Sequence, residues 1–418
     1  MLLRRAFRSG AVPSICHDAA MDSAAAHGHG GAIPPRVRVE VGSPVAARRI
    51  RRVLATAALI VLLPAGISYV SALFGPSNST AGIRSVEWLR DHGAAGLVAK
   101  VESIYYSLTA PAKGGPALKA LPRVGLGSSQ AQRAAREGAE KTVVNRPPRI
   151  GTLTQPALPG EGVWSGTLEH ESRNDPPLLV TTFRSDPAEY PRLVAGVAWI
   201  NTSNTSVSLI AGRQEPAVKL PSRGAMDVPS ANREQLLATF NSGFKLSDSH
   251  GGWALNGHTY APMREGQATF VRYSDGHYDV AAWHGGPSVP SNVVFARQNL
   301  PLIVSGSQSS SKLSNSSEWG ATVGNAVQVW RSGIGIDAHG NILYAAANYQ
   351  TVSSLAKILR HAGAVRAMEL DINSYWISFN TYAAAGALRP AKLLSETERP
   401  ATRYLTPDDR DFFAVYRR

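Results

Sequence analysis

Cysteine is almost absent from this chain of 418 residues, which contains only Cys16. No disulfide can therefore form within the chain, even if most of it lies in an oxidising compartment. A domain outside the cytoplasm must then be stabilised by burial of apolar side chains. The roughly 270 residues from position 151 onward are enough to enclose such a core.

Charge is absent from Val53–Phe74, a run rich in Leu, Val, Ile and Ala. The run is about as long as the roughly 20 helical residues needed to cross a bilayer, so it predicts a transmembrane signal anchor over 53–74. A buried core helix is the alternative. A cleaved signal peptide fits less well, because its apolar stretch is shorter and nearer the start. Four arginines precede the run and no charge follows it in 75–80, which predicts a cytoplasmic N-terminus and an extracytoplasmic C-terminal domain at the cell membrane. These arginines are Arg48, Arg49, Arg51 and Arg52.

The net charge of +13 is unevenly distributed along the chain. Residues 1–52 hold nine Arg and three acids, and residues 111–150 hold eight bases and two acids, so these two segments account for +12 and 151–418 for almost none. A nucleic-acid surface requires positive charge on the folded domain, so no nucleic-acid partner is predicted. The basic segments are better suited to setting topology and to contacting anionic lipid or wall polymers.

Composition divides the chain into five segments. Residues 1–52 form a basic tail with the composition of a disordered segment, and the span at 53–74 follows. Residues 81–110 are predicted to be a short helical stalk, because Leu97, Val101, Ile104, Tyr105 and Leu108 recur at spacings of three and four. Residues 111–159 predict a flexible linker, and 160–418 a folded domain. His27 and His29 are too few to make a metal site, and no metal or cofactor is predicted.

The folded domain is predicted to be α+β, rich in strands and with few helices. Short β-branched and aromatic runs indicate strands, and Ser274-Asp275-Gly276 predicts a hairpin turn between two of them. A second turn is expected at 338–340. An apolar stripe from Val352 to Leu359, with Gly363 after it, predicts a helix that leads into a strand at 367–372. The strand candidates are 178–183, 193–200, 207–212, 268–273, 278–284, 327–330, 334–337 and 342–347.

Three short motifs occur in this region: FNSGFK (240–245), RSGIGID (331–337) and AMELDIN (367–373). In their order and spacing they resemble the phosphodiester glycosidase family, the uncovering-enzyme-like group, over about residues 178–382. Phrases such as FARQNL (295–300) look like its actinobacterial, membrane-anchored branch. The resemblance implies a mixed α and β fold that acts on a sugar joined to phosphate.

The motifs also depart from the family pattern. Ser242 stands where the family has glycine, and Ile372, Asn373 and Ser374 replace a run of three glycines. Glycine allows the backbone to approach a ligand closely, so these replacements bear on activity more than on fold.

The chemistry of a glycosyl phosphodiester indicates which residues are needed. The phosphomonoester is a good leaving group, so phosphate recognition and stabilisation of an oxocarbenium-like centre matter more than strong acid catalysis. A guanidinium binds phosphate oxygens bidentately, which favours Arg331 and then Arg297. Asp371 is the predicted carboxylate. The alternatives are that Arg331 pairs with an acid at a strand end and that Asp371 caps the turn after it.

Further candidates surround these residues. Asn241 is expected to orient a sugar hydroxyl beside Asp371 and Arg331, or to stabilise its own tight turn, and Gly243 is a candidate substrate-binding position. Glu369 lies two residues before Asp371, so the two carboxylates would share a strand face. The histidines His250 and His284 stand beside glycines and are either acid-base groups or ordinary loop residues.

Together these features predict a membrane-anchored extracytoplasmic hydrolase that cleaves a glycosyl phosphodiester bond in a cell-envelope glycan or sugar-phosphate polymer. The alternative is a noncatalytic glycan or wall-polymer binding module with a degenerate site. Under the first hypothesis, Arg331, Asp371 and Asn241 should converge on one cleft.

Overall fold

The computed structural model describes residues 44–125, 146–153, 155–168, 175–185, 189–314, 319–320 and 328–418. The chain divides into two compact units, Met1–Leu63 and Pro64–Arg418. Most of the predicted tail, and the part of the predicted linker over 126–145, lie outside the described residues.

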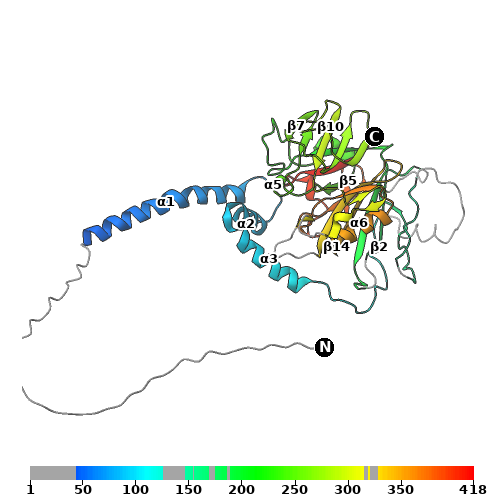
Figure 1. Cartoon of the computed structure of the whole chain (residues 1–418), viewed down its shortest axis with the longest axis horizontal. Coiled ribbons are helices and arrows are strands. Elements are labelled where there is room, and N and C mark those ends of the chain that lie inside the picture. Colours follow the sequence, from blue (N-terminus) through cyan, green and yellow to red (C-terminus); the bar gives the residue numbers. More distant parts are fainter. Residues whose placement is uncertain are drawn as a thin grey trace, which may run out of the picture. The chain divides into compact units, whose positions relative to one another are not determined.

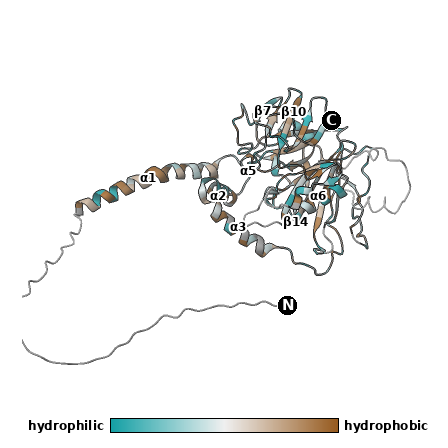
Figure 2. Ribbon diagram, viewed as in Figure 1, coloured by the Kyte–Doolittle hydropathy of each residue, from teal (hydrophilic) through white to brown (hydrophobic). Residues whose placement is uncertain are grey.

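The long N-terminal helix α1 spans Pro44–Phe74 and contains Pro64. It is long and apolar enough to cross a membrane, which confirms the predicted helix, although it begins at Pro44 rather than Val53. Hydrophilic residues, drawn in teal, occur in the N-terminal part of α1 (Figure 2). The sequence of α1 has its four arginines in this part, before the apolar run.

Helical residues follow the span, as predicted for the stalk. Helix α2 covers Ala81–Leu89, a π-helical segment η1 covers Arg90–Ala94, and α3 covers Ala95–Thr109 (Figure 1). The backbone kinks in η1 because Gly93 has a φ of 88°. That left-handed conformation suits glycine, which has no Cβ to clash.

Three antiparallel sheets form the rest of the described chain. The first has the order β1-β2-β3-β14-β13-β15-β11-β12, the second β7-β6-β10-β8-β9, and the third β17-β16-β5-β18-β4. The fold is therefore rich in strands, with few helices, as predicted. The strands are β1 Ser165–Gly166, β2 Leu178–Arg184, β3 Val194–Ile200, β4 Thr205–Ile210, β5 Leu236–Asn241, β6 Trp253–Leu255, β7 His258–Ala261, β8 Ala268–Tyr273, β9 Tyr278–Ala282, β10 Val293–Gln298, β11 Val304–Ser305, β12 Gln308–Ser309, β13 Val329–Ile336, β14 Ile342–Gln350, β15 Arg366–Glu369, β16 Phe379–Ala384, β17 Leu388–Lys392 and β18 Phe412–Arg417.

Helix α6, Val352–His361, joins β14 to β15 as predicted. It begins with a capping box in which the Thr351 and Ser354 side chains each bind the other residue's backbone N–H, and it ends before Gly363, whose φ is 104°. Its apolar side packs on β14 and β13 (Figure 1). The hairpins at Ser274-Asp275-Gly276 and 338–340 are also confirmed. Short helical turns complete the chain: α5 Leu246–Ser249, η2 Ser230–Gln235, η3 Ser311–Ser314 and η5 Arg403–Leu405.

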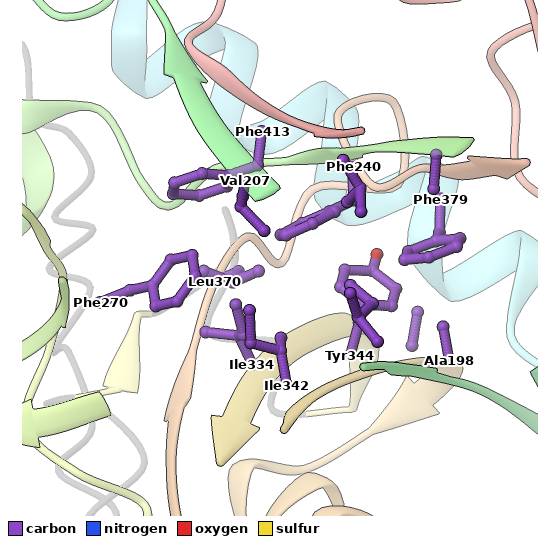
Figure 3. Close-up of a cluster of buried hydrophobic side chains, with 14 of the residues drawn as sticks. Ala198, Val207, Phe240, Phe270, Ile334, Ile342, Tyr344, Leu370, Phe379 and Phe413 are labelled. Carbon is purple, nitrogen blue, oxygen red and sulfur yellow. The ribbon is translucent and has the colours of Figure 1, made fainter. Parts of the chain in front are cut away.

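The largest apolar core lies between the sheets. Phe240, Phe379 and Phe413 from the third sheet face Ile334 and other aliphatic side chains of the first sheet (Figure 3). Phe240 stacks on Phe413, with ring centroids 5.1 Å apart, and on Phe379 at 5.7 Å. The sequence analysis did not predict β5, β16 or β18, which supply these rings.

Parts of the predicted linker contact the domain. Residues 111–125 contain no helix or strand, yet Leu118, Leu121 and Val124 pack against the largest core. Ile150 is buried, and its N–H donates to the Gly162 carbonyl at 3.0 Å. Contacts with the domain thus begin before Gly160.

Candidate functional site

The three sequence motifs meet at the side chain of Ser332. This residue lies in β13, between the end of β5 and the residues that follow β15. Its Oγ accepts from Asn241 Nδ2 at 3.0 Å and donates to the Asp371 carbonyl at 3.1 Å. Its N–H also donates to that carbonyl, at 3.0 Å. Asn241 and Asp371, distant in sequence, are therefore joined through one hydroxyl. The first and third motifs also share an apolar contact between Phe244 and Ile372.

Asn241 uses its whole side-chain amide in contacts within the protein. Its Nδ2 donates to the Ser242 carbonyl at 2.9 Å as well as to Ser332. Its Oδ1 accepts from the Tyr344 hydroxyl at 2.9 Å and from the Ser378 N–H at 3.2 Å. An amide offers two donors and two acceptor sites, so all four are occupied. This arrangement suits a residue that positions the site.

Asp371 is a buried carboxylate with two partners. Its Oδ1 accepts from the Asn373 N–H at 2.9 Å, the turn-capping bond that was one of the two interpretations of this residue. Its Oδ2 accepts from Arg410 Nη2 at 3.2 Å. Burial raises the pKa of Asp371 above its usual value, although Arg410 acts in the opposite direction. The carboxyl therefore holds its proton to a higher pH than a solvated Asp does.

Arg410, which the sequence analysis missed, is the cation at this site. Its Nη2 also donates to the Gly243 carbonyl at 3.1 Å, and its guanidinium lies 5.3 Å from the ring centre of Trp376. Although burial alone would lower the pKa of Arg410, the carboxylates around it raise the value above its usual range. Its Nε is buried and has no hydrogen-bond partner among the described residues. The only sequence signal is the run Asp408-Asp409-Arg410-Asp411 just before β18.

Arg331 is fully buried in a different arrangement. Its Nη1 lies 2.5 Å from Glu369 Oε1, and the guanidinium also donates to the carbonyls of Gln350 and Trp319. The predicted pairing of Arg331 with an acid is thus present, but in the interior. Ser332 bonds the backbone of Asp371, whereas the Arg331 side chain pairs with Glu369, the last residue of β15. The expectation that Arg331 and Asp371 line one cleft finds no support in these contacts.

Glu369 and Asp371 bind different arginines rather than acting as a pair on one strand face. Strand β15 ends at Glu369, so the alternation assumed for the two carboxylates does not continue to Asp371. Burial raises the pKa of Glu369 to about 7, although Arg331 acts in the opposite direction.

Arg297 and Asn299 pack against the first motif, at Phe244 and at Gly243. Arg297 is buried, its Nε donates to Asp411 Oδ2 at 2.9 Å, and its Nη2 donates to the Phe244 carbonyl at 2.5 Å. A Cβ on Gly243 would lie 3.0 Å from the side-chain amide carbon of Asn299. Glycine is needed here for that close approach, because Asn299 also donates to the carbonyls of Glu369 and Leu370.

The two histidines have other contacts. His250 is exposed and ends α5 with a φ of 51°, and its carbonyl accepts from Arg264. His284 is exposed, and its Nδ1 lies 2.5 Å from Glu265 Oε1. Neither residue has a described contact with Asp371 or Arg410.

Glu87 of α2 lies against the first motif. Lys245 Nζ is 2.5 Å from Glu87 Oε2 and 3.4 Å from Asp91 Oδ1. Although burial alone would raise the pKa of Glu87, Lys245 and Arg90 hold it below its usual value. Arg410 adds to this effect, which places the Glu87 carboxylate within the field of both site cations.

The residues that follow α1 also bind the domain. Ser77 donates to Asp409 at 2.6 Å, and Asn78 is hydrogen bonded to Arg399 and to the Arg403 carbonyl. Among the residues that the structure describes, no group of three or more His, Cys, Asp or Glu is arranged to hold a metal ion.

No family model matches the chain, and no curated protein matches it in sequence. Solved structures that are similar to part of the chain include the following three. The zebrafish N-acetylglucosamine-1-phosphodiester alpha-N-acetylglucosaminidase catalytic domain, auto-inhibited by its pro-peptide, is 15% identical over 59% of this chain and 86% of that chain, with a TM-score of 0.36. A hypothetical protein from Synechocystis is 13% identical over 54% of this chain and 59% of that chain, with a TM-score of 0.32. A putative exported protein from Burkholderia pseudomallei is 12% identical over 54% of this chain and 74% of that chain, with a TM-score of 0.27. The chain is thus similar to these structures over little more than half of its own length.

Proposed function

We propose that this protein is a membrane-anchored extracytoplasmic hydrolase that cleaves a glycosyl phosphodiester bond in a cell-envelope glycan or sugar-phosphate polymer. The observation that supports the proposal is the convergence of Asn241, Asp371 and Arg410. Three separate segments supply a carboxylate with a raised pKa, a guanidinium beside it and an amide that is joined through Ser332 to the backbone of Asp371.

In this proposal Asp371 acts at the anomeric carbon, as nucleophile or as electrostatic stabiliser of the oxocarbenium-like centre. Arg410 replaces Arg331 as the residue that recognises phosphate, because it contacts Asp371 directly and its Nε has no hydrogen-bond partner within the part of the chain that the structure describes. Lys245, the last residue of the first motif, supplies a second cation. Asn241 positions the site through Ser332.

The proposed topology follows from the charges on α1. Its four arginines precede the apolar run, so the positive-inside rule places the N-terminus in the cytoplasm and the site outside. The hydrogen bonds of Ser77 and Asn78 to the domain tie the site to the point where the chain leaves the span.

A noncatalytic glycan-binding or wall-polymer-binding module is the second candidate. It is favoured by the closed state of the site: the Asn241 amide is saturated, and both Asp371 and Arg410 are buried. In addition, Ile372 packs against Phe244 in a place where the related motif has glycine.

A substrate panel distinguishes the two functions. The full chain in detergent is incubated with sugar-1-phosphodiesters that differ in sugar and in phosphate acceptor. Release of free sugar that Asp371→Asn abolishes supports the hydrolase. Saturable binding without release, weakened by Arg410→Gln, supports the binding module.

A further inference from the structure

Helix α3 carries a stripe of apolar side chains that no other part of the described chain covers. The side chains of Leu97, Val101 and Leu108 are 64%, 61% and 80% exposed. Ile104 and Tyr105 lie on the same side, at 61% and 57%. At about 100° per residue these positions fall within a band about 100° wide, and we call these five residues the α3 stripe.

The α3 stripe differs from the rest of the described surface. Among the described residues of 146–418, the exposed large apolar side chains are Leu153 and Leu388 alone. The other long run of such residues is in α1, where Val61 and Leu62 are 69% and 66% exposed. Contiguous exposed apolar side chains mark a surface that contacts lipid or protein. The stripe is thus exposed to the same degree as the helix that can cross a membrane.

Contacts place Trp88 of α2 and His92 of η1, which precede α3, beside the last turns of α1. A ring nitrogen of His92 lies 3.2 Å from Ser68 Oγ, and Trp88 Nε1 donates to the same oxygen at 3.0 Å. Helix α3 begins at Ala95, shortly after His92. Ser68 precedes Phe74, the end of α1, by about 9 Å at 1.5 Å per residue. Measured along the axis of α1, the stripe therefore starts near the height of Ser68, before the apolar run of α1 ends.

Arg84 stabilises the turn between α1 and α2, which brings α2 back beside the last turns of α1. Its Nη1 donates to the carbonyls of Leu73 and Gly75 at 2.5 and 2.8 Å. The rings of Tyr69 and Trp88 pack edge to face, 5.1 Å between centroids, beside Ser68. Tyr and Trp are the aromatic residues that favour the membrane interface, where one edge is apolar and the other wet.

We propose that the α3 stripe lies on the bilayer surface, next to the point where α1 leaves it. The partner that contacts the stripe is lipid. The reason is that the stripe follows the membrane-crossing helix closely in sequence and begins near the same height along the axis of that helix. An interfacial helix buries its apolar side at the boundary of headgroups and acyl chains and keeps its polar side in water. The site, joined to α2 through Glu87 and Lys245, is then held close to the membrane surface.

Paired cysteine labels test this placement in the full chain. Cys16→Ser removes the only native thiol, and single cysteines are introduced at Leu97 and Val101 in the stripe. The matched controls are their neighbours Gly96 and Lys100, which share the level along the helix and lie outside the stripe; a Cβ at Gly96 meets nothing within 4 Å. Each variant is labelled with nitrobenzoxadiazole and reconstituted in vesicles of phosphatidylcholine and phosphatidylglycerol.

Labels at Leu97→Cys and Val101→Cys should be quenched by doxyl-labelled lipid about twofold or more beyond their neighbours, and should be less accessible to aqueous iodide. Equal quenching of stripe and control labels by iodide would overturn the proposal. Shielding from iodide without quenching by lipid, with disulfide crosslinking of Val101→Cys between copies, would assign the stripe to a second copy of the chain and would also overturn it.

Discussion

At the scale of single residues, the charge of Asp371 depends on one neighbour. Burial raises the pKa of this carboxyl, and Arg410 is the principal group that opposes the shift. Arg410 is buried too, so each of the two side chains relies on the other for its counter-charge. Removing one member of a buried ion pair leaves the other without its counter-charge, which makes either substitution costly for the fold.

Asp371→Asn keeps the shape of the side chain and removes its charge. If the hydrolase proposal holds, we expect kcat to fall about 100-fold or more, because the charge that stabilises the transition state is lost. We also expect a loss of about 1 to 3 kcal/mol in the free energy of unfolding, because Arg410 loses its partner. Steady-state kinetics and urea unfolding measure the two effects. Unchanged turnover would remove Asp371 from the mechanism.

The buried pair of Arg331 and Glu369 predicts a dependence of stability on pH. The pKa of Glu369 is about 7 in the folded protein, above the value of 4.5 for the free side chain. The folded state therefore binds more protons between these pH values, and the contribution to stability is complete below about pH 4.5 and lost as the pH rises through about 7. The shift corresponds to an effect on the order of 3 kcal/mol at most.

Glu369→Gln cannot titrate, so its free energy of unfolding should fall less between pH 5 and pH 8 than that of the parent. Urea unfolding at both pH values measures the two slopes. The variant is expected to be less stable than the parent at pH 8, because Arg331 loses its carboxylate partner. Only the change in the free energy of unfolding with pH reports the titration of Glu369. If this change is the same in parent and variant, the pH dependence of stability comes from other groups.

At the scale of elements, α2 and the first motif form one ion cluster. Glu87 lies against Lys245 and in the field of Arg410, which are the two cations that an anionic ligand would use. A carboxylate in this position competes with phosphate for the same cations.

Glu87→Gln should increase the affinity for inorganic pyrophosphate by about three- to tenfold, because the competing charge is removed while the side-chain volume is kept. Isothermal titration calorimetry on the full chain in detergent measures this. Glu234→Gln, an exposed position in η2, is the matched control and should leave the affinity unchanged. An affinity that is the same in all three proteins would show that Glu87 does not compete.

At the scale of the whole molecule, the proposed topology makes a prediction about the C-terminus. A reporter that is active only in the cytoplasm, fused after Arg418, should give little signal. The four arginines before Val53 are the reason, since they keep the N-terminal side of α1 in the cytoplasm. Replacing all four with Asn should raise the signal of the same fusion. Strong signal from the parent would contradict both the orientation and an envelope substrate.

The sequence by itself determined the features that depend on neighbouring residues. The apolar run of α1, the α3 stripe, helix α6 with its cap, and the hairpins at Ser274-Asp275-Gly276 and 338–340 each follow from a local period or from turn chemistry, so they could be predicted. The three motifs lie far apart in the sequence but come together in the structure, because Asn241 and the backbone of Asp371 are joined through Ser332. Five strands of the first sheet were predicted at least in part, since β2, β3, β13, β14 and β15 all lie in short runs rich in apolar residues.

Only the tertiary structure decided which arginine faces Asp371. Arg331 stands in the motif but pairs with Glu369, whereas Arg410, from the residues just before β18, contacts Asp371. The pairing of β5 with β18 and β16, and the placement of Glu87 on Lys245, likewise join residues far apart in the chain. Such contacts are fixed by burial and by the pairing of charges across the whole core, and no local pattern in the sequence carries that information.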